Sequence, residues 1–311
     1  MKKLLAFLSA LACLFGLVSC ALPGGESSDG VTLRDDLGNT VRLKGDARVV
    51  SCYGSFAECW LLAGGSLVGV TSDAIDEGRI EESDGLEIVG SVKEIDLERL
   101  IRISPDYVIL SADLTAHLGL EAQLKQLGIP YGYFRVDTFA DYSSLMERFC
   151  AVTGRDDLYA ENVTRVGKSI ENILGSVPQN TGRSVLLMRA YSSGIKAKTD
   201  DNLAGIILKE MGLVNIADEY PSLLEEMSLE HIIRRDPDYI IVLTMGNEES
   251  ALAFLRENLG SNPAWSGLSA VKNGCFFVLP TELFHYKPNE RWDESYEYLA
   301  KAVFPEIFGE N

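Results

Sequence analysis

The stretch EIDLERLIRISPDYVIL occupies residues 94–110, and a close copy, EMSLEHIIRRDPDYIIV, occupies residues 226–242. The copies lie 132 positions apart and agree at nine of their seventeen positions. The identical residues of the first copy are Glu94, Leu97, Glu98, Ile101, Arg102, Pro105, Asp106, Tyr107 and Ile109. A segment of ordinary composition does not repeat so closely by chance. The chain is therefore predicted to contain one structural unit twice.

Each copy has the pattern of a helix that leads into a buried strand. In the first copy Asp96 is a preferred N-cap residue. The apolar residues that follow at helical spacing predict one buried face: Leu97, Leu100 and Ile101. Ser104 stands before a proline, which drives it out of the α region, so the helix is predicted to end there. The strand follows at Tyr107–Leu110. The second copy has Ser228, Asp236 and Tyr239–Leu243 in the same places.

Strand–helix–strand units precede both copies. Residues 48–51 are predicted to form a short buried strand, and Ser55 with Glu58 forms a capping box that is predicted to start a helix. Residues 67–70 form the next strand. In the second half, a strand at Ser184–Met188 is followed by a helix at Asn202–Met211. Alternating strands and helices are typical of mostly parallel sheets.

A long amphipathic helix is predicted at Arg155–Leu174, between the two halves. Its apolar residues form one stripe, and twenty helical residues extend about 30 Å, enough to join two lobes. The predicted fold class is α/β, with two Rossmann-like lobes of mostly parallel sheet joined by a single long helix. The expected divisions are a signal peptide at 1–19, a lipidated tether at 20–31, an N-terminal lobe at 32–153, the connecting helix at 154–177 and a C-terminal lobe at 178–311.

The N-terminus has the pattern of a secretory signal. Two lysines are followed by an apolar run at residues 4–18 that is too short for a permanent membrane anchor. Its ending, Leu-Val-Ser-Cys, resembles a bacterial lipobox, in which Cys20 is diacylated and holds the protein at the membrane face. The alternatives are a plain cleaved signal peptide and a buried helix. Residues 21–31 are rich in Gly and Ser and predict a flexible tether.

The bulk composition limits the function classes. The chain has 311 residues and a formal net charge of −18, which argues against nucleic acid as the partner. Beyond the signal region the cysteines lack metal-ligand spacing, so buried free thiols are predicted, with a Cys52–Cys59 disulfide as the alternative. These cysteines are Cys52, Cys59, Cys150 and Cys275. A monomer is expected.

The order of these segments resembles the substrate-binding lipoproteins of ABC importers for iron–siderophores, haem and cobalamin. DDLGNTVRL at 35–43 resembles the N-terminal hairpin of that family, and residues 48–71 resemble its first strand–helix–strand unit. The duplicated phrase and the C-terminal PNERWDESYEYLAKAVFPEIF at 288–308 complete the resemblance. It implies a class III periplasmic-binding-protein fold with no cofactor of its own and no enzymatic activity. It also implies a lipid anchor at the outer face of the cytoplasmic membrane.

The resemblance also implies a partner. Members of the family present one glutamate from each lobe to arginines of a permease dimer, and by position these residues are Glu98 and Glu230. The alternative is that each glutamate only complements its helix dipole, which contributes about 0.3–1 kcal/mol. Paired charges of this kind steer association and set register more than they add affinity.

The ligand is expected between the lobes, beyond the carboxyl ends of the strands. Residues 183–198 contain four basic side chains and no acid, which favours an anionic ligand. The residues assigned to ligand binding lie in or beside the loops that reach this edge: Tyr53, Lys93, Arg189, Tyr191, Lys198, His285, Tyr286 and Lys287. No metal ligand and no catalytic residue is assigned.

Several of these residues have a simpler interpretation. For Tyr53 and Tyr191 the alternative is an ordinary aromatic at the rim of the cleft, and for Lys198 with Lys196 it is a solvated hairpin. Iron ligation by His285 is the alternative to a hydrogen-bonding role, which is favoured because no second ligand lies nearby in the sequence. Trp292 is predicted to pack the last helix.

The preferred function is capture of a ferric siderophore or related iron complex and its delivery to an importer. Haem and cobalamin are the alternative ligands. An extracytoplasmic α/β enzyme is the less favoured class, because the chain has no G-x-S-x-G, G-x-G-x-x-G or P-loop motif. A surface capture or sensory module without a permease is a third interpretation.

Overall fold

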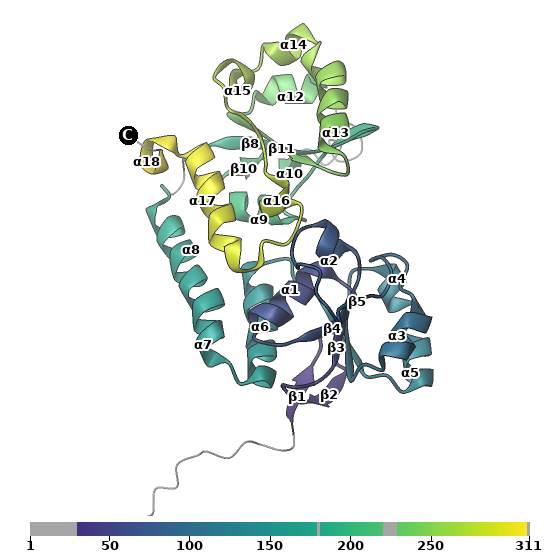
Figure 1. Ribbon diagram of the computed structural model, residues 1–311. Coiled ribbons are helices and arrows are strands. Elements are labelled where there is room, and N and C mark those ends of the chain that lie inside the picture. Colours follow the sequence, from purple (N-terminus) through teal and green to yellow (C-terminus); the bar gives the residue numbers. More distant parts are fainter. Residues whose placement is uncertain (1–29, 179–180, 220–228, 310–311) are drawn as a thin grey trace, which may run out of the picture.

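The computed structural model describes residues 30–178, 181–219 and 229–309. The predicted Cys20 anchor and the Ser228 N-cap lie outside these residues. The described chain forms two α/β lobes, with a long helix running along one side of both (Figure 1). The predicted fold class is confirmed. In the described part, no helix has both the length and the apolar character needed to cross a membrane.

The N-terminal lobe is built on a parallel sheet with strand order β5-β4-β3-β6-β7. In that order the strands are Glu87–Ile88, Leu67–Val70, Val49–Ser51, Tyr107–Ser111 and Tyr131–Phe134. An antiparallel hairpin, β1 (Val31–Arg34) with β2 (Thr40–Leu43), precedes the sheet. The helices are α1 (Gly54–Leu62), α2 (Asp73–Asp76), α3 (Leu97–Ile103), α4 (Thr115–Leu118), α5 (Glu121–Leu127) and α6 (Phe139–Thr153).

The C-terminal lobe repeats this plan. Its parallel strands have the order β10-β8-β11-β12, and β9 pairs antiparallel with β8. These strands are β8 (Ser184–Tyr191), β9 (Gly194–Ala197), β10 (Val214–Asn215), β11 (Tyr239–Thr244) and β12 (Phe276–Val278). The helices up to β12 are α9 (Leu203–Glu210), α10 (Ile216–Glu219), α12 (Leu229–Arg235), α13 (Glu248–Leu255), the π-turn η2 (Arg256–Gly260), α14 (Pro263–Ser266) and α15 (Ser269–Lys272). After β12 come α16 (Thr281–Phe284), the 3₁₀ turn η3 (Asn289–Arg291), α17 (Trp292–Val303) and α18 (Pro305–Phe308).

The two copies of the repeated phrase adopt matching structures. Helices α3 and α12 end at residues with positive φ, 51° at Ser104 and 42° at Asp236. Two residues later, a carboxylate accepts the backbone N–H of a residue at the start of the neighbouring strand. Asp106 accepts from Arg48 at 2.8 Å, and Asp238 accepts from Ser184 at 2.7 Å. The strands β6 and β11 that follow are buried along their whole length.

The start of the first helix differs from the prediction. Ser55 and Glu58 were expected to form a capping box, but Tyr53 occupies the N-cap position of α1 and provides no side-chain cap. Instead the Asp73 carboxylate, 19 residues further on, accepts the Gly54 N–H at 2.7 Å. A tertiary contact has replaced the local one, which leaves Glu58 available for another role.

The helical face predicted for the repeat was also partly wrong. Leu100 is 1% exposed, as expected, but Ile101 is 43% exposed. The buried stripe of α3 continues to Ile103 instead. Residues three apart share a helical face, so the stripe that passes through Leu100 and Ile103 turns Ile101 away from the core.

The connection between the lobes is one helical stretch with a π-bulge. Helix α7 (Asp156–Tyr159), the π-turn η1 (Ala160–Thr164) and α8 (Arg165–Ser176) follow without interruption. Sequence periodicity did not reveal the bulge, which carries the buried Asn162 and its hydrogen bond to the Leu62 carbonyl at 3.0 Å. Helix α17 packs along α8 (Figure 1).

One hydrophobic core extends through both lobes. It contains Trp60 and Phe149 of the N-terminal lobe, Val166 of the connecting helix, and Leu187 and Leu299 of the C-terminal lobe. A continuous packed core deforms little, so we expect this joint to be stiff.

The cysteines of the described chain are free thiols, as predicted. Cys52, Cys59 and Cys150 are buried, whereas Cys275 is half-buried. Burial raises the pKa of the Cys150 thiol to about 11, so this thiol is protonated and unreactive at neutral pH.

Candidate ligand-binding cleft

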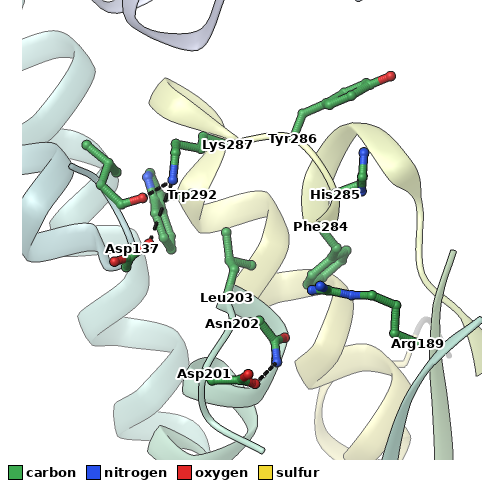
Figure 2. A pocket seen from close by; sticks show the side chains of 11 residues that line it. Asp137, Arg189, Asp201, Asn202, Leu203, Phe284, His285, Tyr286, Lys287 and Trp292 are labelled. Carbon is green, nitrogen blue, oxygen red and sulfur yellow. Dashed lines mark hydrogen bonds and ion pairs between the residues drawn. The ribbon is translucent and has the colours of Figure 1, made fainter. Parts of the chain in front are cut away.

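A cavity of about 170 Å³ lies where the two lobes meet. The N-terminal lobe contributes the segment that follows β7, and the C-terminal lobe contributes β8, the start of α9 and the segment between α16 and α17. The lining residues are Val136, Asp137, Arg189, Asp201, Asn202, Leu203, Phe284, His285, Tyr286, Lys287 and Trp292 (Figure 2). Its position at the carboxyl ends of parallel strands is the usual place for a ligand in an α/β fold.

Strand β8 brings Arg189 to this cavity. Alternate residues of a strand share one face, and Val185 and Leu187 on this face belong to the core that joins the lobes. Arg189 and Tyr191 continue the same face beyond the core. The sequence analysis predicted a strand that ends at Met188, with Arg189 directly after it; β8 continues to Tyr191, so Arg189 lies within the strand, and it lines the cavity.

The hairpin places a second cation beside Arg189. Antiparallel pairing puts Lys196 of β9 directly opposite Arg189. Like charges in this position destabilise a sheet. Among the described residues the Arg189 side chain makes no hydrogen bond or ion pair, although its charge acts on the nearby Asp201 carboxylate. The guanidinium therefore has donors to offer at the edge of the cavity.

Lys198 has a different environment from its neighbours. Its ammonium donates a hydrogen bond to the carboxylate of Asp201, which lines the cavity. Burial acts to raise the pKa of Asp201, but hydrogen bonds from Lys198 and Asn202 and the charge of Arg189 outweigh it, so the pKa lies below its usual value. Lys198 thus holds an ionised carboxylate and does not itself line the cavity.

The side chain of His285 is only partly covered and lines the cavity. Partial burial of the imidazole and the positive charge of Arg189 both lower its pKa. The ring is therefore neutral at pH 7 and offers one donor and one acceptor nitrogen. Tyr286 follows, with its ring centroid 5.1 Å from that of His285, and points away from Phe284 and Arg189 (Figure 2).

Lys287 joins the two lobes. Its ammonium donates to the carbonyl of Val136 and lies 3.8 Å from the carboxylate of Asp137, as Figure 2 shows. Burial lowers the pKa of this lysine. Lys287 therefore links the two lobes at the wall of the cavity, and its ammonium is already engaged by these contacts.

A polar cluster anchors the segment that carries His285 and Lys287. Arg79 donates to Glu58 at 2.6 Å, to Glu77 at 2.7 Å and to the Lys287 carbonyl at 3.2 Å. Its guanidinium also lies 5.5 Å from the centroid of the Tyr286 ring. The N-terminal lobe thus fixes the position of a loop that belongs to the C-terminal lobe.

Asn289 completes this anchor. It is 1% exposed and has a φ of 51°, a left-handed conformation that asparagine tolerates better than most residues. Its amide donates to the Ser55 carbonyl at 3.0 Å and to the Glu58 carboxylate at 2.5 Å. Together, five residues form what we call the junction cluster: Glu58, Glu77, Arg79, Lys287 and Asn289.

Sequence reasoning missed most of the junction cluster. Glu58 was assigned to a helix cap, and nothing in the local pattern marks Arg79 or Asn289. Asn289 does lie in the C-terminal stretch that resembles the family, which is the one signal that pointed to it.

Three other predicted residues lie outside the lining of this cavity. Tyr53 is half-buried at the start of α1 with its ring 4.9 Å from Phe56, and burial followed by the charge of Glu77 raises its pKa to about 12. Tyr191 is half-buried at the end of β8. Lys93 is exposed on the loop before α3.

The loop that carries Lys93 is held by a buried histidine. His117 accepts the Ser111 N–H on Nδ1 at 2.9 Å, so its Nε2–H donates to the Val92 carbonyl at 2.9 Å. Burial lowers the pKa of His117. This ring is a neutral structural element.

The described residues include no group of three or more His, Cys, Asp or Glu side chains that could hold a metal ion. The residues predicted to dock a permease lie elsewhere, on α3 and α12. Both Glu98 and Glu230 are exposed, and the Glu230 side chain, 80% exposed, pairs with Arg234 at 2.7 Å.

Two parallel-sheet lobes, a shared core, a helical joint and a cleft at the strand ends define a solute-binding protein. The chain belongs to the periplasmic binding protein family, which matches residues 49–283. The expected resemblance is thereby confirmed, as is the expectation that the protein is a binding protein and not an enzyme.

Known proteins resemble the chain over nearly its whole length. The Fe(3+)-citrate-binding protein YfmC of Bacillus subtilis (strain 168) is 27% identical in an alignment 322 positions long, which covers 99% of this chain and 98% of the relative. The putative ABC transporter substrate-binding lipoprotein YhfQ of the same organism is 25% identical, and the alignment covers 88% of this chain and 89% of the relative. The crystal structure of the TroA-like periplasmic binding protein FepB from Veillonella parvula superposes with a TM-score of 0.71 at 19% identity. The superposition covers 90% of this chain and 91% of that structure.

Proposed function

We propose that this protein captures an anionic iron complex outside the cytoplasm and delivers it to the permease of an ABC importer. A ferric siderophore or a related complex such as ferric citrate is the proposed ligand. The main support is the Arg189 guanidinium, which lies at the cavity opposite Lys196 and makes no hydrogen bond or ion pair with a carboxylate among the described residues. Ferric complexes of citrate and of siderophores present carboxylate or catecholate oxygens, which a planar guanidinium can bind in pairs. The name of the relative YfmC agrees with this choice.

Haem is a second candidate ligand, and His285 is the observation that favours it. A neutral imidazole is the form that binds iron, and the lowered pKa keeps His285 neutral at the edge of the cavity. Cobalamin is the third member of the set that the family resemblance implies.

The test is calorimetry of residues 21–311 against ferric citrate, ferric catecholate and hydroxamate siderophores, haem and cobalamin, with iron-free citrate as a control. Arg189→Gln is expected to weaken binding of an anionic iron complex by about 10- to 100-fold, because it removes hydrogen bonds from a charged donor. Arg256→Gln, an exposed arginine of the same lobe, is expected to bind as the wild type does. Saturable binding of haem alone, with a Soret shift that His285→Ala abolishes, would replace the siderophore assignment.

Anchoring and delivery are proposed from Cys20, Glu98 and Glu230. Cys20→Ser is expected to release the protein from the membrane fraction. Glu98→Ala together with Glu230→Ala is expected to abolish uptake in cells while ligand affinity is retained, because the two carboxylates lie on α3 and α12, away from the cavity. Normal uptake by the double variant would contradict the docking role of the two glutamates.

A further inference from the structure

The duplicated helices expose an isoleucine at the same position. Ile101 in α3 is 43% exposed, and Ile233 in α12, 132 residues later, is 42% exposed. Each lies three residues after the proposed docking glutamate, Glu98 or Glu230. Residues three apart share a helical face, so each lobe presents an Ile–Glu pair on its surface.

Within the described chain, neither isoleucine takes part in the core packing of its own lobe. The residues next to these isoleucines are buried, with Leu100 at 1% and Ile232 at 0% exposure. Both helices therefore have a buried stripe, and the isoleucines lie outside it. A single exposed aliphatic side chain needs no explanation. Here nearly the same exposure occurs in two helices that also share a left-handed residue at their C-terminal end and an exposed glutamate.

The charges beside the two isoleucines differ. Glu230 pairs with Arg234 at 2.7 Å, but the corresponding Arg102 pairs with Glu87 at 3.1 Å. Glu98 consequently has no hydrogen bond or ion pair to another side chain of the described chain. Its carboxylate is available to a cation of a partner, and Ile101 lies beside it.

Two equivalent surfaces on one chain fit a partner that has two equivalent halves. A closed assembly of two identical or similar subunits provides such halves. Each half would need a cation for the glutamate and an apolar recess for the isoleucine. Exposed ion pairs alone contribute little affinity, whereas each buried aliphatic side chain adds to the apolar area removed from water.

We propose that Ile101 and Ile233 are apolar contacts through which the protein docks on a two-subunit membrane permease, beside Glu98 and Glu230. This inference rests on the docking role proposed above. The glutamates guide the approach and set the register, and burial of the isoleucines slows dissociation.

The first experiment uses the full-length, lipid-anchored chain in cells of its source. A photo-crosslinking amino acid replaces Ile101 in one variant and Ile233 in another. Matched control variants carry it at Leu127 or Leu61, which are 45% and 39% exposed and lie outside the repeat. The expected result is light-dependent crosslinking of both isoleucine positions, but neither control, to the same polytopic membrane protein. Crosslinks to a second copy of the chain, to lipid or to nothing would overturn the proposal.

A competition measurement tests the contribution of the side chains themselves. Membranes from the same cells carry the variant with the crosslinker at position 101, and purified unlabelled chain is added before illumination. The wild-type chain should suppress the crosslink, and Ile101→Ser/Ile233→Ser should need about tenfold more protein for the same suppression. Leu127→Ser should compete as the wild type does. Equal competition by wild type and the double variant would overturn the proposal.

Ligand calorimetry of the double variant distinguishes a docking role of the isoleucines from a general structural defect. Both isoleucines lie away from the lining of the cavity, so the affinity for the iron complex should be unchanged. Weaker competition with unchanged ligand affinity supports a docking role for the isoleucines. A parallel loss of ligand affinity would show a general structural defect and would overturn the proposal.

Discussion

Arg79 offers a sharp test of how much the junction cluster stabilises the protein. The substitution Arg79→Met keeps an unbranched side chain but removes the guanidinium from the junction cluster. Glu58 and Glu77 would lose their cation, and the Lys287 carbonyl would lose a donor. Both carboxylates would then be partly buried charges with less compensation.

The structure limits the size of the effect. Removing one member of a fully buried ion pair costs about 3–5 kcal/mol, and an exposed pair contributes about 0–1 kcal/mol. The Arg79 side chain is 7% exposed and its two carboxylate partners are each 22% exposed, so the pairs lie between these limits. We expect a loss of about 2–3 kcal/mol in the free energy of unfolding. For a chain of this size that corresponds to a fall in Tm of about 3–5 °C.

Urea denaturation followed by circular dichroism measures this loss. Arg102→Met is the matched control, since it removes an arginine from a pair at 3.1 Å whose side chains are 64% and 46% exposed. The control should lose less than about 0.5 kcal/mol. A single transition is expected for both variants because one core spans the lobes. Equal stability of Arg79→Met and Arg102→Met would refute the argument that the partly buried ion pairs of the junction cluster stabilise the protein.

Three further predictions concern pH, thiols and shape. Because the pKa of His117 is lowered in the folded state, its contribution to stability is complete above about pH 6.5 and is lost as the pH falls towards the folded-state pKa. Urea midpoints should therefore fall on acidification. In His117→Gln this part of the pH dependence should vanish, and parallel curves for the variant and the wild type would contradict the assignment. In the native protein, a thiol reagent should modify the half-buried Cys275 before any of the three buried cysteines, and equal rates would show that the core opens. X-ray scattering should give the same radius of gyration with and without ligand within error, because the shared core and helical joint resist closure; a large contraction would contradict a stiff joint.

The parts of the fold that sequence analysis predicted correctly depend on neighbouring residues. Asp96 caps α3 because its side chain reaches the Arg99 N–H three residues away, at 3.0 Å. Helix α3 ends before Pro105, as that proline predicted, although Ser104 adopts a left-handed and not an extended conformation. Such rules act over a few residues, so the helix-to-strand phrase and its copy can be located from the amino-acid order alone.

The same local rules failed where a distant group competed. Glu58 has the spacing of a capping box with Ser55, but Asp73 and Arg79 offer contacts that the sequence pattern does not reveal. Ile101 has helical spacing with Leu97, yet spacing alone does not determine which residues of a helix meet the sheet. The candidate site was predicted in part: Arg189, His285, Tyr286 and Lys287 line the cavity, whereas Asp137 and Asp201 were not foreseen.

The amino-acid sequence by itself determines three features: the duplicated α/β units, the long helix between them and the basic strand end that carries Arg189. Periodicity, caps and proline act through neighbours in the chain, which is why these features can be predicted from it. The roles of Arg79 and Lys287 are decided only by the tertiary structure. Arg79 meets the Lys287 carbonyl across 208 positions, and Asn289 meets Glu58 across 231. These contacts exist because two separately patterned lobes pack against each other, and that packing depends on the shapes of whole surfaces.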